Sequence, residues 1–328
     1  MAWPEEIAIV GAGYMGRGIA EVFALHGAHC VLADLTAERA ASAAELLLGE
    51  AARHEHDGLT PDGSSAELRS RIRSAHSIED AVGGADYVVE AVFENRATKT
   101  DVLRRIEGSL SRDAVISSNT SAISIRTLSE GLDNPARFLG AHWFNPPQFV
   151  PGVELIPCPQ TAAGVLDAVE ALLTRAGKTP ARVADSPGFV GNRLQYALFQ
   201  EAAAVVEEGI ASAESVDQIV RSTFGFRLPI FGPFAIADMA GLDVYGGAYQ
   251  VLVEGFPDRF AVPAALRELV ESGSYGAKTG SGFVIRSEAQ AAAMAARRDR
   301  AYVALGRVVD EFERDEAPAN PAAPGRDR

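Results

Sequence analysis

Residues 7–16 read IAIVGAGYMG, an apolar run of strand type that leads directly into three glycines, Gly11, Gly13 and Gly16. The chain from Tyr14 to His26 then continues with the apolar spacing of a helix. In such a turn the first glycine permits a tight bend, the second lets a pyrophosphate approach the backbone, and the third lets the helix pack on the strand. Free N–H groups and the helix dipole favour the anion there. The stretch therefore predicts a dinucleotide-binding unit, with a plain structural turn as the alternative.

The carboxylate of Asp34 indicates which dinucleotide binds. It ends the next apolar run, Cys30–Asp34, 23 residues after Gly11. A carboxylate at that position hydrogen-bonds a ribose 2′-hydroxyl and repels a 2′-phosphate. The next residues, Leu35 and Thr36, provide no arginine that could hold a phosphate. The predicted cofactor is NAD rather than NADP.

Apolar runs alternate with helical segments from Glu6 to about Asp185, a pattern typical of a parallel sheet with crossover helices. The candidate strands are Ile7–Gly11, Cys30–Asp34, Tyr87–Ala91, Ala114–Ser118, Phe138–Trp143 and Val153–Pro157, with a last edge strand near Pro180 and Val183. A helical insertion, about residues 37–75, separates the second strand from the third and contains the helices Ala37–Arg53 and Ala66–Arg73. We therefore expect residues 1–185 to form an α/β domain with a doubly wound, Rossmann-type sheet.

Residues 186–290 are expected to form an all-helical domain, because no strand pattern follows the turn Asp185–Gly188. One helix runs through Leu194 to Glu208 and is stopped by Gly209, where a left-handed residue is needed. Further helices are predicted over Ser215–Thr223, Phe234–Leu252 and Ala264–Ser272. Residues 291–328 are predicted to form a terminal helix and a tail, APANPAAPGRDR, whose composition is typical of disorder.

The composition excludes several classes of function. The 328 residues carry a net charge of -14. Such a surface repels phosphate backbones and anionic lipids, so neither nucleic-acid nor membrane binding is expected. The N-terminus has acids in place of the basic segment of a signal peptide, and no run reaches the roughly 18 apolar residues of a membrane span. Cys30 and Cys158 lie far apart in apolar runs, which predicts reduced, buried thiols and a cytoplasmic protein.

His142 is the candidate proton acceptor, since histidine usually takes the proton of a hydroxyl group that loses hydride. It follows the apolar run FLGA and opens the irregular turn WFNPP at the carboxyl end of a predicted strand. Ligands bind at that edge of such sheets. The other five histidines fit structural or exposed positions. From the residue context alone, a catalytic role for His142 is no more favoured than a structural role as a buried core histidine.

Eight sequence blocks occur in the order found in the 3-hydroxyacyl-CoA dehydrogenase family: GAGYMGRGIA, VVEAVFEN, SSNTSAISI, GAHWFNPP, VELIP, DSPGFVGNRL, GPFAIADMAGLDVY and GAKTGSGF. The chain resembles this family from Ile7 to about Phe283, nearly its whole length. The resemblance implies an NAD-binding domain followed by an all-helical domain that forms the contact of a homodimer. It also implies an NAD-dependent oxidoreductase that interconverts a hydroxyl and a carbonyl group on a small-molecule substrate by hydride transfer.

The resemblance further implies a catalytic set of four residues. His142 in GAHWFNPP matches the general base, and Glu154 in VELIP matches the carboxylate that holds the imidazole tautomer. Ser121 in SNTS matches a hydroxyl that contacts the substrate oxygen and the nicotinamide, and Asn192 in VGNRL matches an amide donor to the same oxygen. Taken singly, Ser121 also fits a turn residue, Asn192 a helix N-cap and Glu154 a surface acid.

Lysine is rare in this chain, which has three lysines and 27 arginines among its 30 basic residues. By the resemblance, Lys99 after VFEN matches a cofactor contact alongside Glu94, and Lys278 in GAKTGSGF matches a lysine near the nicotinamide. Lys178 is predicted to be a solvated loop residue. The residues assigned to the cofactor site are Gly11, Gly13, Gly16, Tyr14, Met15, Asp34, Glu94, Lys99, Asn145 and Lys278. No metal ligand is assigned.

The inserted helices depart from those of relatives that act on acyl-CoA. Those relatives carry lysines there that meet the CoA phosphates, whereas Leu35–Ala75 has no lysine, seven acids and five arginines. The segments NPPQFVPGVELI and NRLQYALFQEAAAVVEEGIAS are more similar to the branch with gulonate dehydrogenase and the lens lambda-crystallins, or to the one that oxidises a pyridine-ring hydroxymethyl group. The substrate is therefore open between a CoA thioester, a carrier-tethered hydroxyacyl group, a hydroxy acid such as gulonate and a hydroxymethyl aromatic. A non-catalytic, crystallin-like scaffold is the rival from another class, and the intact catalytic set argues against it.

Overall fold

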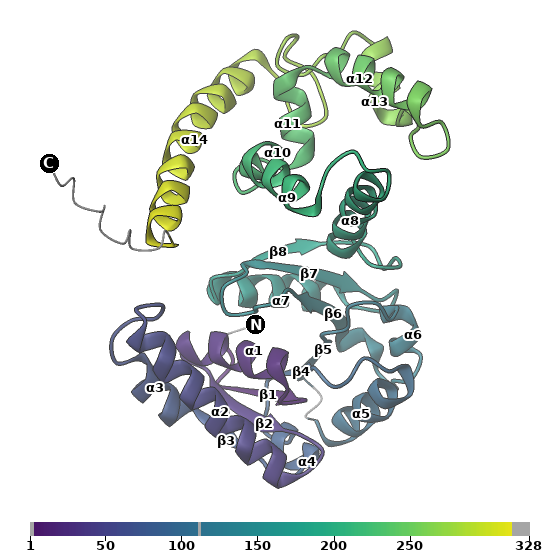
Figure 1. Ribbon diagram of the computed structural model, residues 1–328. Coiled ribbons are helices and arrows are strands. Elements are labelled where there is room, and N and C mark those ends of the chain that lie inside the picture. The colour runs from purple at the N-terminus through teal and green to yellow at the C-terminus, as the bar shows by residue number, and fades with distance from the viewer. Residues whose placement is uncertain (1–2, 111–112, 317–328) are drawn as a thin grey trace, which may run out of the picture. The chain divides into compact units, whose positions relative to one another are not determined.

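The computed structural model describes residues 3–110 and 113–316, and its contacts divide the chain into two compact units, Met1–Gln200 and Glu201–Arg328 (Figure 1). The division falls within helix α8 (Gly191–Glu207), whereas the boundary predicted near Asp185 precedes that helix and stays a prediction. The tail predicted to be disordered after Glu316 lies outside the described residues.

The first unit is built on one sheet, whose described strands lie in the order β3-β2-β1-β4-β5-β6-β7-β8. The strands are β1 (Glu6–Val10), β2 (His29–Ala33), β3 (Ile72–Ser74), β4 (Tyr87–Glu90), β5 (Val115–Ser118), β6 (Phe138–Trp143), β7 (Gly152–Pro157) and β8 (Thr179–Arg182). The chain starts in the middle of the sheet, runs outward through β2 to β3, and returns to the other side of β1 with β4. This reversal defines a doubly wound sheet, so the predicted fold class is confirmed.

Helices cover both faces of this sheet (Figure 1). Ile7 and Ile9 of β1 pack in one core with α1 and α2, whereas Ala8 and Val10 pack in a second core with α4 and α5. Because side chains alternate along a strand, a strand buried on both faces is apolar at every position, as IAIV is. The helices of this unit are α1 (Tyr14–Leu25), α2 (Ala37–His56), α3 (Ser64–Arg71), α4 (Ile78–Val82), α5 (Arg96–Ser109), α6 (Ile125–Ser129), α7 (Ala163–Arg175) and the start of α8. A short 3₁₀ turn covers Pro135–Arg137.

The sheet is not parallel throughout, which corrects the sequence-based expectation. Strand β7 runs antiparallel to β6, in a register that sets His142 opposite Glu154. The two strands are joined by residues 144–151 without a helix, and a connection this short returns the chain antiparallel.

The insertion also differs from its prediction. The second inserted helix ends at Arg71 and is followed by strand β3, which the sequence analysis missed. This strand pairs parallel with β2 at the sheet edge and has one buried residue, Ile72. Three residues with one buried side chain give too little alternation to be recognised.

The second unit is helical in its described part. It contains α9 (Ala213–Ser222), α10 (Phe224–Arg227), α11 (Pro233–Ala240), α12 (Leu242–Gly255), α13 (Ala264–Glu271) and α14 (Glu288–Glu316). The single helix predicted over Phe234–Leu252 is wrong: Gly241, at φ +103°, separates α11 from α12. The stop at Gly209 is confirmed, since this residue follows α8 with φ +71°.

Candidate active site

The glycine turn between β1 and α1 has the shape that the sequence predicts. Gly11 has φ +100°, and a Cβ there would lie 2.5 Å from the backbone carbon of Ala91. A Cβ on Gly16 would lie 2.0 Å from the carbonyl oxygen of Gly11. A Cβ on Gly13 would meet nothing within 4 Å, so open space lies directly beside the N-terminus of α1. The turn thus fits a pyrophosphate approaching Gly13, while Gly11 and Gly16 permit the close backbone packing.

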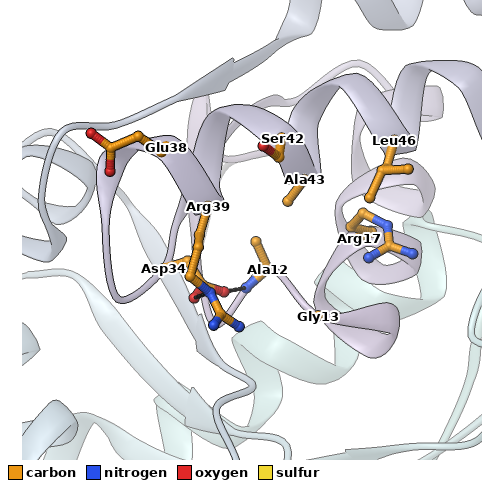
Figure 2. Close-up of a pocket in the computed structure, with 9 residues that line it drawn as sticks. All are labelled: Ala12, Gly13, Arg17, Asp34, Glu38, Arg39, Ser42, Ala43 and Leu46. Carbon is orange, nitrogen blue, oxygen red and sulfur yellow. Dashed lines mark hydrogen bonds and ion pairs between the residues drawn. The ribbon is translucent and has the colours of Figure 1, made fainter.

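A cavity of about 350 Å³ lies beside this turn and is lined by Ala12, Gly13, Arg17, Asp34, Glu38, Arg39, Ser42, Ala43 and Leu46 (Figure 2). Asp34 accepts the backbone N–H of Ala12 at 3.0 Å, which fixes its carboxylate at the end of β2. The Nε of Arg39 donates to the same carboxylate at 2.9 Å. Leu35 and Thr36 provide no arginine, as the sequence indicates, but Arg39 lies beside Asp34. The first turn of α2 places residue 39 next to residue 34, which the immediate neighbours of Asp34 in the sequence do not reveal.

The candidate general base is held by a buried carboxylate. Nδ1 of His142 lies 2.8 Å from Oε2 of Glu154, and both side chains are less than a tenth exposed. The rings of Phe144 and Phe189 pack on the imidazole, with centroid distances of 4.6 and 5.6 Å. The antiparallel pairing of β6 with β7 creates this dyad, because it sets the two residues directly opposite each other. Contact with a carboxylate at Nδ1 favours the tautomer whose Nε2 is free to accept a proton.

The second oxygen of Glu154 ties the dyad to α8. Its Oε1 accepts the backbone N–H groups of Val190 and Gly191, at 2.9 and 2.8 Å. At the second residue of the helix, the side-chain amide of Asn192 donates to the carbonyl oxygen of Ser121 at 3.1 Å. A single carboxylate therefore orients His142 and anchors the helix start that carries Asn192.

Glu94 organises the turn that carries Ser121. Its Oε1 accepts hydrogen bonds from the hydroxyl of Thr120 at 2.5 Å and from the backbone N–H groups of Ser121 and Ala122 at 2.9 and 3.0 Å. Partial burial raises the pKa of the Glu94 carboxyl, but these hydrogen bonds and the charge of Lys99 outweigh it, so the pKa is lowered. The carboxylate is thus stabilised in its charged form at the base of the Ser121 turn.

Lys99 does not reach the cavity surface. Its side chain is fully buried, and its Nζ lies 2.8 Å from Glu90, 3.1 Å from the carbonyl oxygen of Val92 and 3.4 Å from Glu94. Burial raises the pKa of the Glu90 carboxyl, against the effect of the Lys99 charge and the hydrogen bond from Ser118. Lys99 therefore compensates the buried carboxylate of Glu90 and contacts Glu94. Its role in cofactor binding stays a prediction.

A second cavity, of about 470 Å³, brings together six of the fourteen predicted site residues, including three of the four in the predicted catalytic set. Its lining residues are Met15, Ala91, Val92, Glu94, Asn119, Ser121, His142, Trp143, Phe144, Asn145, Asn192 and Gln195. Two of these residues, Asn119 and Gln195, were not among the predicted site residues. The side-chain oxygen of Asn119 accepts the N–H of Trp143 at 3.0 Å. Both had a signal, since Asn119 lies in the block SSNTSAISI and Gln195 is three residues, or one helical turn, after Asn192.

The turn after His142 is fixed by Lys178, which corrects the prediction of a solvated loop lysine. The Nζ of Lys178 donates to the carbonyl oxygens of Pro147, Gln148 and Val150, at 2.5, 3.3 and 3.0 Å. The residue is buried, and this burial lowers the pKa of its ammonium group. The carbonyl groups of an irregular turn have no strand partners, so a buried cation can satisfy three of them at once.

The remaining predicted lysine lies in the second unit. Nζ of Lys278 is 2.8 Å from both carboxylate oxygens of Asp243. The hydrogen bond from Lys278 lowers the pKa of Asp243. The loop that carries Lys278 packs closely on α11, since a Cβ on Gly276 would lie 2.3 Å from the carbonyl oxygen of Asp238. The cofactor role of Lys278 stays a prediction.

No group of three or more histidine, cysteine, aspartate or glutamate side chains in residues 3–110 and 113–316 has the arrangement of a metal site. Within the same residues, no helix has both the length and the apolar character that crossing a membrane requires.

Family models, known proteins and solved structures match this chain over most of its length. A family model of the 3-hydroxyacyl-CoA dehydrogenase NAD-binding domain matches residues 6–186, and one of the C-terminal domain matches residues 188–286. The chain is 35% identical over 308 residues to the 5-formyl-3-hydroxy-2-methylpyridine 4-carboxylate 5-dehydrogenase of Mesorhizobium japonicum, which covers 94% of this chain and 99% of that protein. It is 36% identical over 282 residues to the fatty acid oxidation complex subunit alpha of Idiomarina loihiensis, covering 84% of this chain but spanning only 38% of that relative. The crystal structure of a 3-hydroxyacyl-CoA dehydrogenase from Archaeoglobus fulgidus has a TM-score of 0.76 and 32% identity, covering 93% of this chain and 99% of that one.

Proposed function

We propose a mechanism and a substrate class on the premise that this chain belongs to the 3-hydroxyacyl-CoA dehydrogenase family, whose two domain models together match nearly its whole length. It is an NAD-dependent dehydrogenase that acts on CH–OH donors. The proposals concern what its own residues do, which substrate they accept and how the chain assembles.

The pairing of His142 with Glu154 carries the proposed mechanism. With Nδ1 held by Glu154, Nε2 of His142 takes the proton of the substrate hydroxyl as the carbonyl forms, and the carboxylate stabilises the imidazolium. When bound, NAD⁺ supplies the acceptor for the hydride that leaves the substrate carbon. The hydroxyl of Ser121 and the second N–H of the Asn192 amide donate to the substrate oxygen. The hydrogen bond between Asn192 and the carbonyl of Ser121 supports this role, because it keeps the two residues beside the same cavity.

We propose that the substrate is a small hydroxy acid or hydroxymethyl aromatic rather than a CoA thioester. A relative that matches nearly the full length of this chain is named for a pyridine carboxylate. The insertion, about residues 37–75, also offers little to CoA phosphates. Arg71 pairs with Glu67 and Arg73 with Glu6, so two of the arginines that could form a basic patch are already engaged.

The test compares kcat/KM for three kinds of substrate, with NADH absorbance as the readout. These are a 3-hydroxyacyl-CoA, the same acyl group on a truncated thioester, and a set of free hydroxy acids and hydroxymethyl pyridine carboxylates. We expect a non-CoA substrate to be best, or the full thioester to exceed the truncated one by less than tenfold. A larger advantage, above about 1.4 kcal/mol of transition-state binding, would restore the CoA thioester as substrate.

We also propose that the chain is a cytoplasmic homodimer that associates through its helical second unit. The described part of that unit has a small core, centred on Ala237, Leu242 and Leu266. It exposes large apolar side chains, among them Ile219 at 55% and Val251 at 69%. Apolar area of this kind is typical of a surface that a partner covers. Buried cysteines without a disulfide and the acidic composition support the cytoplasmic assignment.

A further inference from the structure

The carboxylate of Asp34 is more heavily engaged than a simple NAD-binding acid needs to be. Its Oδ1 accepts the backbone N–H of Leu35 at 2.8 Å and the Nε of Arg39 at 2.9 Å, while Oδ2 accepts the N–H of Ala12 at 3.0 Å. A carboxylate oxygen has about two lone-pair sites. Oδ1 is therefore saturated, and a ribose hydroxyl that bonds to it must compete with Arg39.

Arg39 is the arginine of this cavity that contacts Asp34, and it has donors to spare. Its side chain is 64% exposed, and within residues 3–110 and 113–316 no hydrogen bond involves its two terminal nitrogens. The guanidinium of Arg17 is instead matched by Glu50, through contacts of 3.2 and 3.0 Å. The carboxylate of Glu38 points away from Asp34 and Ala12 (Figure 2). Next to Asp34, the local charge is therefore set by one acid and one arginine.

We propose that Arg39 weakens the preference of this site for NAD over NADP. The ribose hydroxyls meet the acid at the end of the second strand in this fold, so a 2′-phosphate would lie beside Arg39 as well as Asp34. The guanidinium reduces the repulsion from Asp34 and offers its terminal N–H groups to the phosphate. Toward NAD its effect is opposite, because it leaves only Oδ2 of Asp34 with a free acceptor site for a ribose hydroxyl.

The test measures the dissociation constants of NADH and NADPH by nicotinamide fluorescence, with the full chain and without any substrate. Arg39→Gln removes the charge and the two terminal nitrogens and keeps an amide near the position of Nε. We expect the ratio of Kd for NADPH to Kd for NADH to rise about tenfold, the effect of one charge-assisted hydrogen bond. Arg39→Lys keeps the charge but loses the planar fork, so its ratio should fall between those of the wild type and Arg39→Gln.

Arg69→Gln is the matched control, since it removes one positive charge from the exposed surface of α3 outside the cavity. Its ratio should equal that of the wild type. The proposal is overturned if Arg39→Gln leaves the ratio unchanged or lowers it, or if Arg69→Gln raises it equally. Circular dichroism of each variant separates a change in the site from a loss of folded protein.

Discussion

At the scale of single residues, this site depends on carboxylates that serve two purposes at once. Glu154 contacts His142 with one oxygen and the first N–H groups of α8 with the other. Glu94 holds the Ser121 turn with one oxygen and faces Lys99 with the other. Because each acid joins two segments of the chain, replacing it changes the position of a neighbouring residue as well as the local charge.

The lowered pKa of Glu94 gives a pH-dependent prediction. A carboxyl whose pKa is lower in the folded protein than its ordinary value of 4.5 stabilises the fold fully above that value. This contribution is lost as the pH falls through the folded pKa. Glu94→Gln should therefore reduce the free energy of unfolding near neutral pH. The difference in this free energy between variant and wild type should shrink as the pH falls below 4.5.

Denaturant unfolding at several pH values measures this difference. Glu45→Gln, at an exposed position of α2, is the control and should show no such pH-dependent difference. A Glu94→Gln difference that stays constant from neutral pH to the lowest pH at which the wild type is folded contradicts the assigned role.

At the scale of elements, the antiparallel return from β6 to β7 is the feature that makes the site. It sets His142 opposite Glu154, and its connection carries Asn145. The sequence analysis predicted both strands but not their antiparallel pairing. Apolar runs report burial, whereas strand direction follows from the short connection. Likewise, the neighbours of Asp34 in the sequence gave no sign of Arg39, because a helical turn brings residue 39 back to it.

The burial of Lys178 could not be predicted from its neighbours in the sequence either. A lysine between a glycine and a threonine, in AGKTP, is most often solvated, and nothing local indicates that three carbonyl groups lie opposite. By contrast, the glycine turn and the strand ends were predicted well, since the need for a glycine and the burial of a strand are local properties.

Lys178 should stabilise the connection between β6 and β7. Lys178→Met removes the donor and leaves buried carbonyl groups unpaired, so we expect a loss of about 2–4 kcal/mol in the free energy of unfolding. A fall in kcat should accompany it, because the connection follows His142 directly. Arg182→Gln on β8 is the control: its ion pairs with Asp167 and Glu170 are exposed to solvent, so its loss of stability should be much smaller than that of Lys178→Met. Equal losses in the two variants would show that Lys178 has no special role.

At the scale of the whole molecule, the second unit gives a prediction about assembly. Its described helices bury few apolar side chains among themselves and expose many. We expect light scattering at micromolar concentration to give the mass of two chains. Val251→Glu, which places a charge on this exposed apolar surface, should shift the mass toward one chain. A monomeric wild type would refute the proposed dimer.

We propose that His142, oriented by Glu154, accepts the substrate proton. The most direct test is the rate of hydride transfer in a single turnover of the His142→Gln variant, with NADH binding measured in parallel. We predict that NADH affinity and the fold are kept, that the rate falls by about 10²–10⁴, and that adding Glu154→Gln lowers it little further, because the pair acts as a unit. A His142→Gln variant that keeps more than about a third of the wild-type rate would contradict the account, since a positioned base contributes far more than that.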